Sequence, residues 1–221
     1  MRWIECYLEF RLGGEEKLEA FVKVSSRVIP LPNDNVDTDI IVPARFLKVT
    51  DKANMDKYLF RDWRFDAEGN PRPDFILNQP RARGAKIFLV GGNFGSGSSR
   101  EHAPWALLAF GFRALISTSF ADIFRGNSLK NGLLPVVVPP EVHAELFRMV
   151  EADPAMELAI DLSLQTVTLP DGRSVSFPID NFSKQCLLGG VDQLGYLLKQ
   201  EAHIRAYEEA HPPVVQTTKV S

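Results

Sequence analysis

The sequence predicts an α/β fold in which helices flank a mostly parallel central sheet, with a β-hairpin added to it. Three observations support this fold class. The apolar residues 87–90 lead into a glycine-rich loop and then into helix-forming sequence. Strand-like and helix-like segments alternate over residues 113–150, as in sheets covered by helical crossovers. The turn sequence Pro-Asp-Gly at 170–172 separates two strand-like runs, which is typical of a hairpin.

The expected elements follow from local composition. Valine and isoleucine favour strands, whereas clusters of Asn, Asp, Gly and Pro favour turns. Gly111 can end the helix that follows the glycine-rich loop. The expected segments are a strand at 20–30, a polar loop at 33–39, a short helix at 52–60, a turn-rich excursion at 66–74, strands at 86–90, 113–117 and 134–138, hairpin strands at 164–169 and 175–177, and helices up to about 110, at 120–130, at 140–150, at 180–188 and at 190–209.

The chain length of 221 residues, 45% of them hydrophobic, suits one substantial core. We expect a single domain over residues 20–209, an N-terminal extension over 1–19 and a flexible tail over 210–221. The extension has two open interpretations. Gly-Gly-Glu-Glu at 13–16 is what a purine-rich ribosome-binding site encodes if it is translated. Under one interpretation the protein therefore starts at Leu18, and under the other the first residues are a genuine N-terminal extension.

Composition argues against several classes of function. A net charge of −3 without a long basic run argues against a nucleic-acid surface. The two cysteines, Cys6 and Cys186, cannot form a metal cage by themselves, and their number fits a reducing compartment. No apolar run reaches the roughly 18 residues of a membrane span, and the N-terminus lacks a signal-peptide core. We therefore expect a cytoplasmic protein that binds neither nucleic acid nor membrane.

Residues 91–104 carry the strongest functional signal, with the sequence Gly-Gly-Asn-Phe-Gly-Ser-Gly-Ser-Ser-Arg-Glu-His-Ala-Pro. Glycines allow backbone N–H groups and a helix N-terminus to converge on an anion. Two adjacent hydroxyls, Ser98 and Ser99, stand at the tip beside Arg100. A guanidinium offers a planar fork to a carboxylate, which lysine cannot do. The loop is therefore a candidate site for a carboxylate ligand.

Three familiar motifs do not match this loop. The dinucleotide fingerprint G-x-G-x-x-G needs a third glycine where Arg100 stands. A phosphate-binding P-loop needs a lysine, which the loop lacks. The hydrolase motif G-x-S-x-G fails because Ser96 lies directly between two glycines and Ser98 has no glycine two residues later.

Ser98 has a structural and a functional interpretation. The spacing Ser98-x-x-Glu101 matches a capping box, which would make Ser98 a plain helix cap. Pro104 argues against this, because it would then be the sixth helical residue, whereas proline is comfortable in the first turn. We expect the cap near Glu101, which leaves both serines and the arginine in the loop. For His102 a supporting role in the site and a purely structural role both stay open.

Several stretches together resemble one known family. They resemble the small subunits of isopropylmalate isomerase (3-isopropylmalate dehydratase), the counterpart of the swivelling C-terminal domain of aconitase. The resemblance covers about residues 20–209 and implies a swivelling β/β/α domain. Ser96 is a departure, since bacterial members usually have cysteine there. The matching stretches are Asn-Val-Asp-Thr-Asp at 35–39, Asp-Trp-Arg-Phe at 62–65, Pro-Asp-Phe-Ile-Leu-Asn at 73–78, the glycine-rich loop with residues up to 107, residues 119–128 and Leu-Leu-Pro-Val at 133–136.

The resemblance also implies roles for individual residues. Ser98 matches the base that removes a proton beside a carboxylate, and a serine hydroxyl needs stabilisation of its anion to do so. Ser99 and Arg100 match groups that bind the substrate carboxylate. The substrate side group would face the segment that carries Arg45, Phe46 and Leu47. Phe46 and Leu47 are candidate walls for that group, although they would be equally ordinary as core or hinge residues. Supporting residues are expected at Asp37, Asp39, Gly95, Gly97, His102 and Asn127.

A cofactor and a partner are implied in the same way. The resemblance implies a 4Fe-4S cluster held by three cysteines of a separate large subunit, with no metal bound by this chain, which would be inactive alone. The assembly would be a heterodimer or larger, acting on a small dicarboxylate as a hydro-lyase. Two alternatives stay open: a homoaconitase or dimethylmalate dehydratase small subunit, which the stretch at 62–65 disfavours, and a non-catalytic module using the loop as an anion nest.

Overall fold

The computed structural model describes residues 18–49 and 52–211. The predicted extension at 1–19 lies outside the described residues except for Leu18 and Glu19. The predicted tail at 210–221 lies outside them beyond His211. Within the described residues, no helix has the length and apolar character needed to cross a membrane.

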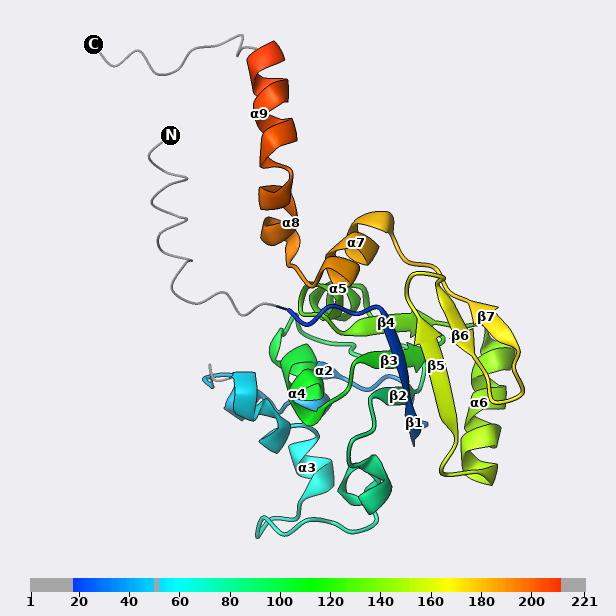
Figure 1. Cartoon of the computed structure of the whole chain (residues 1–221). Coiled ribbons are helices and arrows are strands. Elements are labelled where there is room, and N and C mark those ends of the chain that lie inside the picture. The colour runs from blue at the N-terminus through cyan, green and yellow to red at the C-terminus, as the bar shows by residue number, and fades with distance from the viewer. Residues whose placement is uncertain (1–17, 50–51, 212–221) are drawn as a thin grey trace.

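One seven-stranded sheet, in the order β4-β3-β2-β1-β5-β6-β7, organises the fold (Figure 1). β1 is its central strand and pairs on both sides. Its second half, Val28 to Leu31, runs parallel to β2, and its first half, Lys23 to Arg27, runs antiparallel to β5. The first four strands are parallel and the last three extend the sheet in antiparallel fashion. The strands are β1 (Lys23–Leu31), β2 (Ile87–Val90), β3 (Ala114–Ser117), β4 (Leu134–Val137), β5 (Glu157–Asp161), β6 (Thr166–Thr168) and β7 (Ser174–Ser176).

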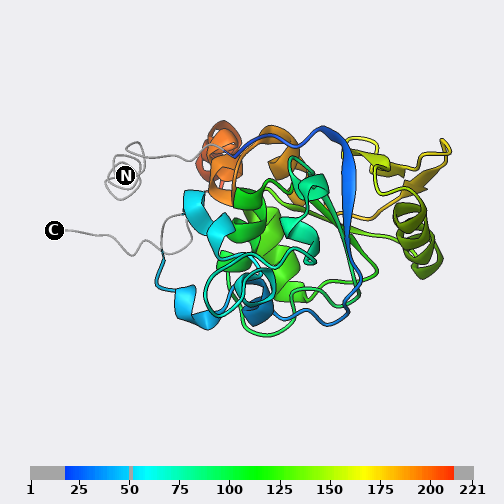
Figure 2. The same ribbon diagram turned by 90° about the horizontal axis from the view of Figure 1, so that it is seen from below.

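Helices cover both faces of the sheet. Figures 1 and 2 place α4 and α6 on opposite sides of it, and Figure 1 shows α8 and α9 projecting from the body as an arm. Short 3₁₀ turns occupy residues 44–46, 52–57, 76–78 and 80–82. The helices are α2 (Thr38–Ile41), α3 (Arg61–Arg64), α4 (His102–Phe110), α5 (Asp122–Lys130), α6 (Pro140–Ala152), α7 (Asn181–Gly189), α8 (Gln193–Lys199) and α9 (Glu201–Ala210).

The core consists of two apolar clusters separated by the sheet. Side chains of a strand alternate between its faces. All four residues of β2 are buried, so this strand contributes side chains to both clusters. Phe88 packs under α4, where its ring stacks on Phe112 with 4.5 Å between centroids. Ile87 and Leu89 point to the other cluster, beneath α6. Burial on both faces explains why this strand has a continuous apolar run instead of an alternating one.

Most predicted elements are confirmed, two predicted helices differ, and the short helices α2 and α3 were not predicted. The strand–loop–helix unit around the glycine-rich loop, the second strand–helix cycle and the hairpin are present. The strand β5 was not predicted, although its alternating burial is visible in the structure. The predicted helix at 52–60 is a 3₁₀ segment, Lys52–Lys57. The predicted helix at 190–209 is two helices, because Gln200 has non-helical dihedral angles (φ −94°, ψ 6°) between α8 and α9.

Candidate functional site

The glycine-rich loop lies where the parallel strands end. β1, β2 and β3 run in the same direction, so the segments that follow them meet at one edge of the sheet. Isolated β-bridges join the loop to both neighbours, Asp37 to Ser96 on one side and Phe94 to Phe120 on the other. The loop is therefore held between the segment after β1 and the segment after β3.

Backbone hydrogen bonds pair the loop with the segment after β1. The Asn35 amide donates to the Gly92 carbonyl (2.8 Å), and the Gly95 amide donates to the Val36 carbonyl (2.8 Å). Thr38 then donates its amide to the carbonyl of Ser96 (2.8 Å). Because these bonds follow one another along both segments, the loop backbone is positioned as far as Ser96.

Gly95 and Gly97 are required by this packing. Both have left-handed backbone angles, with φ of +79° and +90°. A Cβ atom at Gly95 would overlap the ring of Phe124, and one at Gly97 would overlap the carboxylate of Asp37. Two of the predicted supporting residues thus let the loop approach α5 and the start of α2.

The structure places the start of α4 where Pro104 predicted it. Glu101 is the N-cap residue and Pro104 is the third residue of the helix, within the first turn. Ser98 is therefore not the cap, which confirms the prediction. Ser98 and Ser99 are exposed in the loop, three and two residues before the cap. Both serines precede the N-terminus of α4, which is the positive end of its dipole.

Arg100 is held by Asp39. The two side chains form an ion pair, and Arg100 is mostly buried, with 13% of its side chain exposed against 47% for Asp39. Asp39 is itself fixed, because its amide donates to Oδ1 of Asp37 (2.6 Å), the N-cap of α2. The predicted carboxylate-binding arginine thus already binds a carboxylate of the protein, in a partly open position.

The segment with Arg45 and Phe46 is anchored by other residues. Arg45 makes a two-pronged ion pair with Asp62 of α3, in which one nitrogen donates over 3.0 Å. This hydrogen bonding holds the pKa of Asp62 below its usual value. The Phe46 ring packs on Tyr58 with centroids 4.5 Å apart. The structure therefore ties this segment to the region 58–62.

His102 connects the segment at 45–49 to the N-terminus of α4. Its ring nitrogen Nε2 lies 3.1 Å from the carbonyl oxygen of Val49, and its ring packs against Trp105. Phe46 and Val49 pack against the same apolar cluster as the first turn of α4, and Leu47 is half-buried beside them in sequence.

Asn127 lies on the buried face of α5. It is 8% exposed, and its side-chain nitrogen has no hydrogen-bond partner among the described residues. The main-chain carbonyl of Asn127 accepts a hydrogen bond from the side-chain amide of Asn131 (2.8 Å). The side-chain oxygen of Asn131 in turn accepts from the indole N–H of Trp105 (2.8 Å). Asn127 thus belongs to a polar connection between α5 and α4.

Four polar residues that support the loop were missed at the sequence level. Asp34 accepts from the Gly92 amide (2.6 Å), and the Ser119 hydroxyl accepts from the Asn93 amide (2.8 Å). The buried Ser117 hydroxyl lies 2.7 Å from the Gly91 carbonyl, and Thr38 donates its hydroxyl to the Ser98 carbonyl (3.0 Å). Small polar residues at the end of β3 and in the segments that follow β1 and β3, the two strands on either side of β2, are the signal that could have identified them.

The residues of this chain do not supply the three cysteine ligands of an iron–sulfur cluster. Three thiolates cannot come from two cysteines, of which Cys6 lies outside the described residues and Cys186 is buried in α7. Burial raises the pKa of the Cys186 thiol, which disfavours the thiolate form that binds metals. Across 18–49 and 52–211, no three His, Cys, Asp or Glu side chains are grouped so that they could hold a metal ion.

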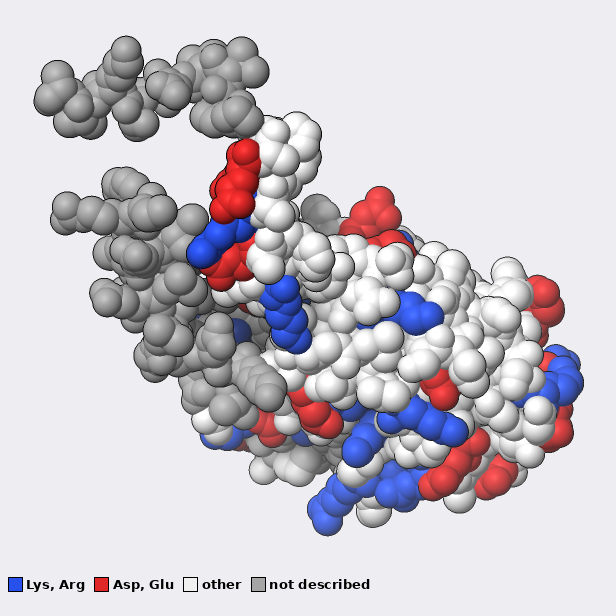
Figure 3. Space-filling model, turned by 45° about the horizontal axis from the view of Figure 1, so that its top comes forward, with Lys and Arg blue, Asp and Glu red and all other residues white. Residues whose placement is uncertain are grey.

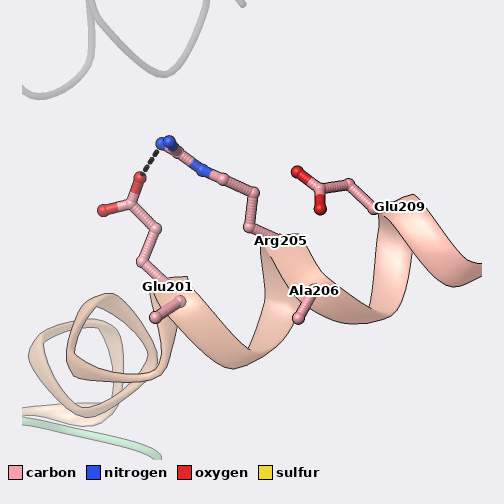
Figure 4. Close-up of a pocket in the computed structure, with 5 residues that line it drawn as sticks. Glu201, Arg205, Ala206 and Glu209 are labelled. Atoms are coloured by element: carbon pink, nitrogen blue, oxygen red, sulfur yellow. Dashed lines mark hydrogen bonds and ion pairs between the residues drawn. The ribbon is translucent and has the colours of Figure 1, made fainter.

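Other surface features lie away from the loop. A hollow on one face of α9 is lined by Glu201, Ala202, Arg205, Ala206 and Glu209, with Arg205 donating to Glu201 over 2.6 Å (Figure 4). On the face drawn in Figure 3, Lys and Arg are interspersed with Asp and Glu around a broad uncharged area. The hollow on α9 includes no predicted site residue.

Known proteins match both the sequence and the fold. The model of the aconitase C-terminal domain matches residues 18–141, and the LeuD_N model matches residues 144–181. Proteins named 3-isopropylmalate dehydratase small subunit are similar over most of both chains. That of Roseiflexus castenholzii is 60% identical over 195 residues (88% of this chain, 96% of the relative). That of Chloroflexus aurantiacus is 58% identical over 200 residues (90% and 100%).

A solved structure supports the fold assignment. The crystal structure of 3-isopropylmalate dehydratase from Methanocaldococcus jannaschii covers 84% of this chain and 99% of its own, with a TM-score of 0.61 and 24% sequence identity. The domain match, the 60% identity over nearly the full length of a relative and this fold agree. The chain belongs to the aconitase C-terminal domain family, as a member of its 3-isopropylmalate dehydratase small subunits.

Proposed function

We propose that this chain is the small subunit of the hydro-lyase that interconverts 2-isopropylmalate and 3-isopropylmalate in leucine biosynthesis. The reaction removes water to form 2-isopropylmaleate and adds it back with the hydroxyl on the neighbouring carbon. One observation carries the proposal at the level of the site. Two exposed serines and the mostly buried Arg100 follow one another just before the N-cap of α4, on a loop whose backbone is hydrogen-bonded to the segment after β1 as far as Ser96.

Ser98 is proposed as the catalytic base. A serine hydroxyl is a poor base near neutral pH, so Ser98 must act as its alkoxide, which nearby positive charge stabilises and whose Oγ becomes the hydroxyl when it accepts the substrate proton. The N-terminus of α4 and the guanidinium of Arg100 lie within a few residues of Ser98 and supply such charge. The exposure of Ser98 supports a role towards a ligand outside this chain.

Ser99 and Arg100 are proposed to bind a substrate carboxylate. A guanidinium has five N–H donors, so Arg100 can contact a second carboxylate while it retains Asp39. Arg45, Phe46 and Leu47 are proposed to face the isopropyl group. The ion pair of Arg45 with Asp62 supports a defined position for that segment.

The proposed partner is a large subunit that carries a 4Fe-4S cluster. The cluster, when bound there, supplies a Lewis acid for the departing hydroxyl. This chain contributes the serine Oγ that accepts the proton as an alkoxide and the carboxylate-binding groups. Exposure of Gly97, Ser98 and Ser99 supports a site that a second protein surface completes and shields from water. The cytoplasmic location remains a prediction.

Reconstitution tests the proposal. The chain is combined anaerobically with its cognate large subunit and iron, and the interconversion of the two isopropylmalates is followed by product analysis. Turnover by the complex and none by either chain alone is expected. Turnover of homoaconitate or dimethylmalate, with no turnover of isopropylmalate, would support the related hydro-lyases. A colourless chain that binds phosphate and does not bind the large subunit would support the anion-binding module.

A further inference from the structure

We propose that Thr38 is a positioning residue that holds the backbone of Ser98 in its working place. The inference rests on the proposed function of Ser98 as the base. Thr38 is among the few buried polar side chains of the domain, with 1% of its surface exposed. Its hydroxyl donates to the carbonyl of Ser98 over 3.0 Å, across 60 positions of sequence.

Thr38 donates hydrogen bonds to the loop at two points. Its amide donates to the carbonyl of Ser96 (2.8 Å) and its hydroxyl donates to the carbonyl of Ser98. Gly97 lies between these two carbonyls and has the left-handed φ of +90°. The two bonds therefore fix the peptide units on either side of the residue that has the widest range of backbone angles.

Thr38 itself cannot easily shift. It is the first residue of α2, and the N-cap residue before it, Asp37, accepts from the amide of Asp39. Asp39 in turn pairs with Arg100. Consecutive residues of the α2 start thus contact Ser96, Ser98 and Arg100, so the base candidate and the carboxylate-binding candidate are set by one rigid turn.

The hydroxyl is the decisive group, because the backbone-to-backbone pairing ends at Ser96. Beyond it, the Thr38 hydroxyl donates to the carbonyl of Ser98, whose side chain is exposed. A displacement of about 1 Å in a reacting group can cost roughly 10²-fold in rate. Losing this bond should therefore affect the chemical step more than the binding of substrate.

Matched variants test the proposal in the reconstituted enzyme. Thr38→Val keeps the branched shape and removes the donor, whereas Thr38→Ser keeps the donor. We expect Thr38→Val to lower kcat by about 10- to 100-fold with KM within about threefold, and Thr38→Ser to stay within about threefold of wild type in kcat. Ser26→Ala is the control, because the Ser26 hydroxyl accepts the Lys86 amide (2.8 Å) between β1 and the start of β2 and should leave kcat unchanged.

Hydrogen exchange of the isolated chain provides a readout that does not depend on substrate. The amides of Gly95 and residue 38 donate to the Val36 and Ser96 carbonyls across this contact. They should exchange at least about tenfold faster in Thr38→Val, and in Thr38→Ala as a second donor-free variant, than in wild type or Thr38→Ser. Wild-type kcat and exchange in Thr38→Val would overturn the proposal, as would a Thr38→Ser variant as impaired as Thr38→Val. Inactive wild-type complex together with faster exchange in Thr38→Val would refute the proposed function and still support the hydroxyl contact.

Discussion

Asp37 and Gly97 lie so close together that residue 97 has no room for a side chain. A Cβ atom there would overlap the carboxylate of Asp37. The same carboxylate caps α2 by accepting the amide of Asp39. One close approach therefore sets the shape of the loop on one side and the start of a helix on the other.

Replacing Gly97 by alanine should damage both stability and activity. The left-handed backbone alone costs about 1–2 kcal/mol for a residue with a Cβ, and the overlap with Asp37 adds displacement of the loop. We expect a lower free energy of unfolding in urea and at least about a tenfold loss of turnover in the complex.

Gly126→Ala is the matched control for that variant. Gly126 lies inside α5, and a Cβ atom there would meet nothing within 4 Å. Alanine should stabilise the chain by about 0.5–1 kcal/mol. A Gly97→Ala chain with wild-type stability and turnover would show that the approach of Asp37 is not a constraint.

Replacing Ser98 by alanine should abolish turnover and leave substrate affinity within about tenfold, because proton-transfer groups contribute roughly 10²–10⁴ in rate. Single-turnover kinetics and equilibrium binding to the reconstituted complex separate the two effects. Ser99→Ala is the comparison, for which we expect weaker binding as the main defect. Near-normal turnover of Ser98→Ala would return Ser98 to a structural role in the loop.

Replacing Arg100 by lysine should weaken binding and rate together. Lysine keeps the charge but loses the planar fork that can serve Asp39 and a substrate carboxylate at once. Arg113→Lys is the control, since Arg113 is similarly buried (15% exposed) and pairs with Glu19 outside the site. Steady-state kinetics should show a loss in kcat/KM for Arg100→Lys alone. An equal loss in both variants would point to a general effect on folding.

The free energy of unfolding should depend slightly on pH through the ionisation of Asp62. Hydrogen bonding from Arg45 lowers the folded-state pKa of Asp62 below its unfolded value of about 3.9. Its contribution is present above the unfolded pKa and is lost as the pH falls through the folded pKa. Both side chains are more than half exposed, so the contribution should stay below about 1 kcal/mol and shrink at high salt.

Urea unfolding of wild type and Asp62→Asn between neutral and acid pH measures this contribution. The two unfolding free energies should differ at neutral pH and converge as the pH falls. A constant difference across the whole range would mean that the carboxylate charge of Asp62 does not contribute to stability.

The strand β5 illustrates a limit of reading the sequence. Leu158 and Ile160 are buried and their neighbours are partly or fully exposed, which is the alternation of a half-buried strand. The run is only five residues long, and its partner β1 lies more than a hundred positions earlier in the chain. Such a short pattern becomes a strand because the first half of β1 offers a free edge, which depends on the assembled sheet.

Local chemistry alone determined the parts of the site that lie within one segment. Apolar residues before the loop predicted a buried strand, Pro104 predicted a helix start near Glu101, and Gly111 predicted its end, which the left-handed φ of +115° confirms. These rules depend on dihedral angles and hydrogen bonds between neighbours in the chain, so they can be applied without knowledge of the fold.

Only the tertiary structure decided which residues of different segments meet. Thr38 contacts Ser98 and Asp39 contacts Arg100 across 60 and 61 positions. Those contacts exist because β1 and β2 are parallel neighbours whose ends share one edge of the sheet, with Leu31 opposite Val90. Strand order and register follow from burying both faces of the sheet at once. That burial is a property of the whole chain, and no single segment encodes it.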